Sequence, residues 1–142
     1  MSLSTWKKEF YPITAIEAAK QGPRAALEHS IKKWEGGAVA NCKKHGISIG
    51  KGIGKGIIYD FSFDGESCAL CKLFLGDPCE GCPLYIALGH NVCDDPRQPY
   101  STFIHTGSVR SMLAALRKAR RLFTDPKRRK KLTAEERKAL GL

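Results

Sequence analysis

Four cysteines near the middle of the chain have the residue type and the spacing of a metal site. They form two Cys-x2-Cys pairs separated by seven residues: Cys68 with Cys71, and Cys79 with Cys82. A Cys-x2-Cys pair in a tight turn brings two thiolates close enough to share one metal ion, and two such pairs complete a tetrahedral shell of sulfurs. The spacing therefore predicts a closed, structural zinc site that fixes a loop-rich segment.

Other ligand sets and other thiol chemistries stay open. Cys93 and His90 are alternate ligands, because the seven-residue separation is shorter than the roughly 12 to 20 residues found in many zinc ribbons. An iron–sulfur cluster is the second interpretation, since Cys-x2-Cys-Pro at residues 79–83 resembles the end of a ferredoxin motif. Disulfides or buried thiols are the third. Cys42, the sixth cysteine, is expected to be a small buried hydrophobic residue.

The same cysteines give little support for catalysis. Residues 78–82 match the Pro-Cys-x2-Cys half of the zinc deaminase motif, whose other half is His-x-Glu or Cys-x-Glu. None of the upstream histidines and cysteines has a glutamate two residues later, so the general base of that chemistry is missing. A metal-dependent enzyme acting on nucleic acid is therefore the least favoured function. We assign no catalytic residue and expect the protein not to be an enzyme.

The positive charge of the protein is concentrated towards residue 142. The chain has 24 Lys and Arg residues against 14 Asp and Glu residues, which gives a net charge of +10. Residues 110–142 hold 12 of the basic and 3 of the acidic residues, a net charge of +9, whereas residues 1–109 have a net charge of +1. This asymmetry predicts a near-neutral, metal-stapled body over 1–109 and a basic amphipathic helix and arm over 110–142, and it indicates an anionic partner.

Nucleic acid is the predicted partner, because clustered Lys and Arg side chains neutralise phosphates. The predicted contact residues lie in the helix and arm, with two more in a Gly-Lys segment over 50–56: Arg117, Lys118, Arg120, Arg121, Lys127, Arg128, Arg129, Lys130, Lys131, Lys51 and Lys55. Nothing resembles a base-reading helix, so we expect weak sequence specificity and do not distinguish DNA from RNA. A solvated charged surface without a ligand is the alternative interpretation.

The hydrophobic pattern predicts helices on both sides of a short hairpin. Apolar residues at i, i+4 and i+7 predict a helix over 23–35, and a longer stripe over 109–123 predicts the basic helix, with one apolar and one positive face. Alternating apolar residues over 57–63 predict a strand, with Ile47 and Ile49 in its partner. The expected fold is a small single α+β domain, with a short antiparallel β-hairpin, flanking helices and a pair of cysteine knuckles that bind zinc.

Several short motifs resemble those of a family of short, uncharacterised bacteriophage and prophage proteins. They are TWKKEFYP (5–12), HSIKKWEG (29–36), CALC (68–71), CEGCPL (79–84) and the later Cys93. The resemblance implies a bacteriophage setting and a cysteine-bound metal. It implies no particular activity.

A host or phage protein is the second candidate partner. The aromatic opening could dock on it, or the apolar turn of Leu70, Leu73, Phe74 and Leu75, although a small core beneath the metal explains that turn more simply. The chain has no run of about 18 apolar residues and no apolar secretory core near its start, so we expect no membrane contact and a cytoplasmic location. In a reducing cytoplasm, clustered thiols favour metal over disulfides.

Overall fold

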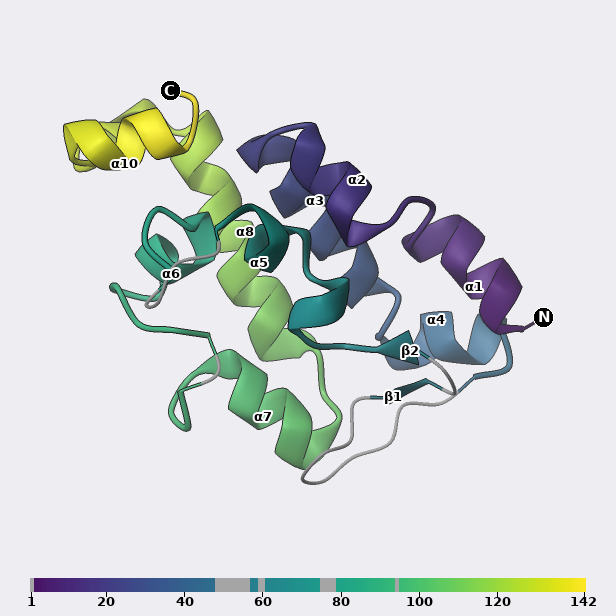
Figure 1. The fold of residues 1–142 in the computed structure, drawn as a ribbon. Coiled ribbons are helices and arrows are strands. Elements are labelled where there is room, and N and C mark those ends of the chain that lie inside the picture. The colour runs from purple at the N-terminus through teal and green to yellow at the C-terminus, as the bar shows by residue number, and fades with distance from the viewer. Residues whose placement is uncertain (1, 48–56, 59–60, 75–78, 94) are drawn as a thin grey trace.

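Helices form most of the chain in the computed structural model, which describes residues 2–47, 57–58, 61–74, 79–93 and 95–142. The helices are α1 (Leu3–Phe10), α2 (Ala15–Lys20), α3 (Pro23–Glu35), α4 (Val39–Lys44), α5 (Ala69–Leu73), α6 (Pro83–Ala87), α7 (Pro99–Thr106), α8 (Arg110–Thr124), α9 (Pro126–Arg129) and α10 (Ala134–Ala139), with a 3-10 turn, η1 (Gly65–Ser67). Figure 1 shows α8 running alongside α3 and behind α5 and α6.

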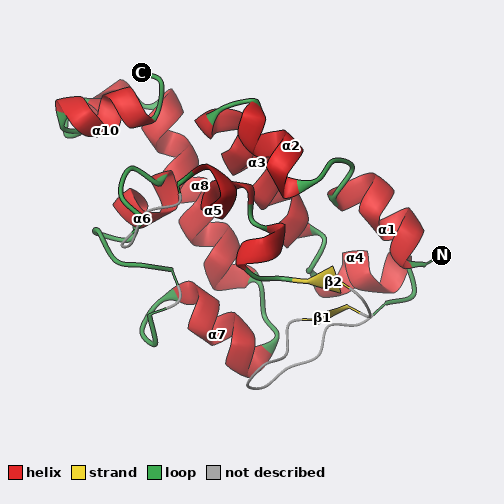
Figure 2. Cartoon of the chain, viewed as in Figure 1, coloured by secondary structure: helices red, strands yellow, loops and turns green. Residues whose placement is uncertain are grey.

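The predicted α+β class is wrong, because extended backbone is almost absent from the described residues (Figure 2). It is limited to β1 (Ile57–Ile58) and β2 (Phe61–Ser62), which pair antiparallel in the register Ile57 to Ser62. Two residues on each side are too few for the expected hairpin, since an ordinary strand has about five or six. Ile47, expected in the partner strand, belongs to no strand and is buried in the core. Ile49 lies outside the described residues.

The alternating pattern that suggested a strand has another physical cause. Phe61 and Phe63 are both buried, and the ring of each contacts aromatic rings of the surrounding helices. The ring centroid of Phe61 lies 5.1 Å from that of Trp6, and the ring of Phe63 lies 5.1 Å from Trp34 and 5.6 Å from Phe103. The alternation at Phe61 and Phe63 therefore reflects two rings that pack into a helical core, not one face of an extended sheet.

Helix α3 occupies the centre of the fold and contacts α1, α2, α5 and α8. Its observed bounds, Pro23–Glu35, confirm the helix predicted from the apolar spacing. Leu27, Ile31 and Trp34 are almost completely buried. Because the helix is enclosed on several sides, even polar side chains at its middle are drawn into the core.

Helix α8 confirms the predicted amphipathic pattern. Its apolar face is buried against α3, α6 and α7 through seven residues: Met112, Leu113, Ala115, Leu116, Ala119, Leu122 and Phe123. Arg117, Lys118 and Arg121 are exposed on the other face. Burial of the apolar stripe therefore anchors the helix and holds these charges at its outer surface.

The segment after α8 folds back on the turn between α5 and α6. Leu132 and Leu140 are buried, with 6% and 3% of their surface exposed. His90 Nε2 lies 2.9 Å from Glu136 Oε1. A Cβ atom on Gly81 would lie 2.9 Å from the Cβ of Ala139, so α10 contacts the turn closely.

Gly36 marks the closest approach between α1 and the end of α3. Trp6, which is fully buried, donates a hydrogen bond from Nε1 to the Gly36 carbonyl at 2.9 Å. A Cβ atom at Gly36 would lie 2.7 Å from both Phe10 Cγ and Trp6 Cζ2. The backbone of Gly36 has helical dihedral angles that alanine also adopts, so the constraint is steric.

We expect Gly36→Ala to lower the free energy of unfolding by about 1–3 kcal/mol, because two buried rings must move to admit the methyl group. Urea denaturation followed by circular dichroism measures this change. Gly65→Ala is the matched control, since its Cβ would meet only Cys71 Sγ at 4.0 Å, and it should change stability by less than about 0.5 kcal/mol. Equal effects of the two variants would contradict the close approach of α1.

Candidate functional site

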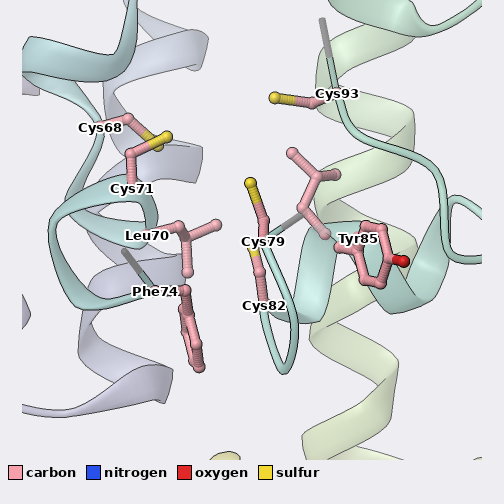
Figure 3. A pocket seen from close by; sticks show the side chains of 9 residues that line it. Cys68, Leu70, Cys71, Phe74, Cys79, Cys82, Tyr85 and Cys93 are labelled. Carbon is pink, nitrogen blue, oxygen red and sulfur yellow. The ribbon is translucent and has the colours of Figure 1, made fainter. Parts of the chain in front are cut away.

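Five of the six cysteines line one small cavity between α5 and α6. They are Cys68, Cys71, Cys79, Cys82 and Cys93, and the cavity has a volume of about 20 Å³. Figure 3 shows Cys68 and Cys71 on one wall and the other three facing them, with the sulfurs of Cys68, Cys71 and Cys93 directed into the space between the walls. Three separate segments of the chain therefore bring their thiols to one place.

Local backbone structure explains how each Cys-x2-Cys pair forms. Cys68 is the N-cap residue of α5 and Cys71 lies in the first turn of this helix, so the two thiols lie close together (Figure 3). In the second pair, the Cys82 N–H donates to the Cys79 carbonyl at 3.0 Å, and Gly81 supplies the positive φ of 82° that closes this turn. Pro83 then starts α6.

Hydrogen bonding lowers the pKa of one thiol of the first pair, that of Cys68. The Cys71 thiol donates to Cys68 Sγ, which lowers the pKa of Cys68, and the nearby ammonium of Lys33 adds to this effect against the cost of burial. The same hydrogen bond, together with burial, raises the pKa of Cys71. The pair therefore shares one proton and ionises once more readily than free thiols do. Burial raises the pKa of Cys82 to about 12.

The sulfurs face one another but do not stand at metal-binding distance. Within the described ranges, no three Cys, His, Asp or Glu side chains are close enough together to hold a metal ion. The donor set nevertheless fits zinc, because thiolates are among its preferred ligands. A volume of about 20 Å³ also suits a single ion, since a particle of water size needs roughly 10–15 Å³ by the same measure.

A larger cavity of about 560 Å³ adjoins the cysteines. Four of the five thiols border both spaces, and Cys82 borders only the small one. Lys33 and Trp34 from α3, Asp64, and Tyr100 from α7 lie on the wall of the larger space. The Tyr100 hydroxyl donates to the Phe63 carbonyl at 2.6 Å, which ties α7 to this wall.

The structure separates the two alternate ligands. Cys93 lines the cysteine cavity, whereas His90 does not, and His90 instead pairs with Glu136 and leaves 56% of its side chain exposed. Cys42 is buried away from the site, with Sγ 3.4 Å from the Gly36 carbonyl, as expected for a small hydrophobic residue. From the sequence, Cys93 could be predicted only as an alternate metal ligand.

The predicted nucleic-acid contacts fall into two groups. Arg120, Arg128 and Arg129 have partners within the protein: Arg120 Nε and Nη2 donate to the Glu28 carboxylate at 2.7 and 2.9 Å, Arg128 lies 3.8 Å from Asp125, and Arg129 donates to the Phe123 carbonyl. In the described structure the others are exposed and form no ion pair: Arg117, Lys118, Arg121, Lys127, Lys130 and Lys131. Lys51 and Lys55 lie outside the described residues.

Two basic residues next to the basic surface and the thiol cavity were not predicted as site residues from the sequence. Arg110 is exposed seven residues before Arg117, so the helical period puts both on one stripe, and this spacing was the available signal. The two arginines and the exposed Val39 border a groove of about 510 Å³. Lys33 is the other, and it is buried on the wall of the larger cavity because several helices pack around α3.

Comparison with known proteins adds no relative: no family model, no curated protein and no solved structure matches this chain. The bacteriophage setting therefore stays an expectation from the short motifs. None of the helices in the described ranges is long and apolar enough to span a membrane.

The Arg120–Glu28 pair joins α8 to α3, so we expect Arg120 to act in the fold rather than on a ligand. Arg120→Ala should lower the free energy of unfolding by about 0.5–1 kcal/mol, the range of a partly exposed ion pair. Arg117→Ala, an exposed neighbour on the same helix, should change it by less than about 0.5 kcal/mol. Denaturation at low and high salt tests this, and the contribution of Arg120 should shrink as salt screens the pair. Indistinguishable variants would contradict the assignment.

Proposed function

We propose that this protein is a zinc-binding protein that binds nucleic acid through the exposed basic residues of α8 and of the following segment, 125–131. The observation that carries the nucleic-acid part is a set of cations without carboxylate partners on a helix whose opposite face is anchored in the core. The observation that carries the metal part is the meeting of five thiols at one ion-sized cavity. Zinc has a structural role in this proposal.

Cys68, Cys71 and Cys79 are three of the proposed zinc ligands, and Cys82 or Cys93 is the fourth. All of them border the same small cavity, and the hydrogen bond between Cys71 and Cys68 already stabilises one thiolate. The pairs must close around the ion, since the sulfurs do not stand at binding distance in the described structure. Zinc then cross-links α5 to the turn before α6, which couples metal binding to folding of this region.

The basic surface is suited to phosphates because its charges are available and held in position. Arg117 and Arg121 lie one helical turn apart, with Lys118 beside them, while Leu116 and Ala119 of the same helix are buried. Arg120 has a carboxylate partner, so the free cations are those that the fold does not itself use. Such contacts depend on phosphate charge and give little sequence preference.

The groove beside Arg110 and Arg117 supports the same proposal. Its volume of about 510 Å³ and its lining by Val39, Thr106 and Gly107 give an uncharged surface next to two guanidinium groups. A phosphate on the arginines leaves the attached sugar or base next to this groove.

Most of the apolar side chains expected to contact a protein partner are buried or partly buried in the described structure. Trp6 and Phe10 of the aromatic opening are buried in the core, and Leu70 of the apolar turn is 1% exposed. Leu73 and Phe74 are partly buried against the same core, and Leu75 lies outside the described residues. No specific observation in the described structure therefore favours the protein–protein function.

We expect the protein purified under reducing conditions to hold one zinc ion per chain, bound only by sulfur. Cys71→Ala should weaken zinc binding at least tenfold, because it removes a ligand from the cavity. Cys42→Ala is the matched control and should retain zinc, since Cys42 lies outside the cavity. Elemental analysis, X-ray absorption and chelator competition measure these outcomes. A metal-free protein, or equal loss in both variants, would overturn the metal proposal.

We expect binding to labelled DNA or RNA to weaken steeply with salt. If six cations contact phosphates, log K should fall with log salt at a slope of about −5 for a duplex and about −4 for a single strand. The combined variant Arg117→Ala, Lys118→Ala, Arg121→Ala should lower affinity about tenfold or more and reduce the slope by about 2 to 3. Fluorescence anisotropy across a salt series measures both.

The control for net charge removes three exposed cations from α2 and α3: Lys20→Ala, Arg24→Ala, Lys32→Ala. It lowers the total charge of the protein by the same amount as the α8 variant. It should weaken binding much less, because these residues lie outside the proposed surface. Equal weakening in the two variants would show attraction by net charge alone and would contradict a binding surface on α8.

A further inference from the structure

Lys33 is a buried ammonium at the centre of the protein. Only 1% of its surface is exposed, although lysine is among the residues least often buried. Its Nζ donates to the Ser67 carbonyl at 3.2 Å and to the Ser67 hydroxyl at 3.1 Å. Its Nζ also lies 5.3 Å from the ring centroid of Trp34 and 5.8 Å from that of Phe63.

These contacts satisfy hydrogen bonds but provide no carboxylate to balance the positive charge. Within the described part of the chain, Lys33 forms no ion pair with a carboxylate. The Asp64 carboxylate also acts on Lys33, but it accepts the N–H of Glu66 at 2.9 Å and makes no ion pair with the ammonium. A buried charge without an opposite charge costs several kcal/mol, and burial lowers the pKa of Lys33, so an anion beside this lysine would stabilise its charged form.

The thiols of the cavity act on Lys33 electrostatically, and Cys68 and Cys71 do so most strongly. Ser67, its hydrogen-bond partner, directly precedes Cys68, and Lys33 lies on the wall of the same cavity as Cys68, Cys71 and Cys93. Ser30, one turn earlier on α3, places its hydroxyl oxygen 3.9 Å from Cys68 Sγ. The buried face of α3 therefore presents a hydroxyl and an ammonium to the first cysteine pair.

We propose that Lys33 is the counter-charge of the metal centre. The proposal rests on the zinc site proposed above, and it adds a residue and a charge requirement to that site. Four thiolates carry more negative charge than one zinc ion neutralises, so a centre of this composition is an anion and gains from an adjacent buried cation. An all-cysteine ligand set, with Cys93 rather than His90 as the alternate, gives the excess negative charge that Lys33 offsets.

Lys33→Met tests this inference, because methionine keeps a long apolar stem and removes the charge. We expect zinc affinity to fall about 10- to 100-fold, the usual effect of losing a group that supports the ligands. We expect the metal-free variant to be at least as stable as the metal-free wild type, since it no longer buries an ammonium that has no carboxylate partner. Chelator competition and thermal denaturation, each with and without zinc, measure the two effects.

Lys32→Met is the matched control, an exposed lysine on the same helix, and should leave both quantities unchanged. Zinc affinity of Lys33→Met within twofold of the wild type would overturn the role of Lys33 while leaving the zinc site intact. A metal-free Lys33→Met protein that loses its helical circular dichroism would also overturn it, because Lys33 would then hold the fold through its own hydrogen bonds. Absence of zinc from the wild type would instead refute the zinc site itself.

Discussion

The packing of α8 against α3 is the contact on which the rest of the structure depends. It buries the apolar stripe of α8 and turns Arg117, Lys118 and Arg121 outwards. It also encloses the middle of α3, where Ser30 and Lys33 meet the first cysteine pair. One helix pair therefore orients both the basic surface and the thiol cavity, and the Arg120–Glu28 ion pair spans the same interface.

The cysteine turn and the basic segment looked independent in the sequence but are in contact in the fold. Helix α6, which follows Cys82, packs on α8. Ala139 of α10 approaches Gly81 between the second pair of cysteines, and Glu136 pairs with His90. A conformational change on zinc binding, in the turn between α5 and α6, would therefore be transmitted to α10, which follows the basic surface in the chain.

The sequence was sufficient to predict helices whose burial follows one regular stripe. Helix α3 and the apolar face of α8 are of this kind, because their spacing repeats over three or more turns. The clustering of the cysteines was also predictable, since the turn geometry of each pair is local. Cys93 was less so, because its place depends on how the chain returns to the cavity after α6.

Features set by distant parts of the chain were not predictable in the same way. Phe61 and Phe63 alternate as a strand does, yet their partners are rings from α1, α3 and α7. Arg120 has the same residue type as its exposed neighbours, and only the position of Glu28 on α3 distinguishes it. Lys33 is buried because several helices pack around α3, and no local sequence pattern indicates this burial.

The Arg120–Glu28 contact also constrains the order in which the chain can fold, because its two residues are 92 positions apart. Part of the buried face of α3 has no covering until α8 has been made and has docked. Closing so long a loop is slow compared with forming local structure, so the apolar face of residues 23–35 stays uncovered until α8 docks. During synthesis, the early helices therefore depend on late residues for protection from aggregation.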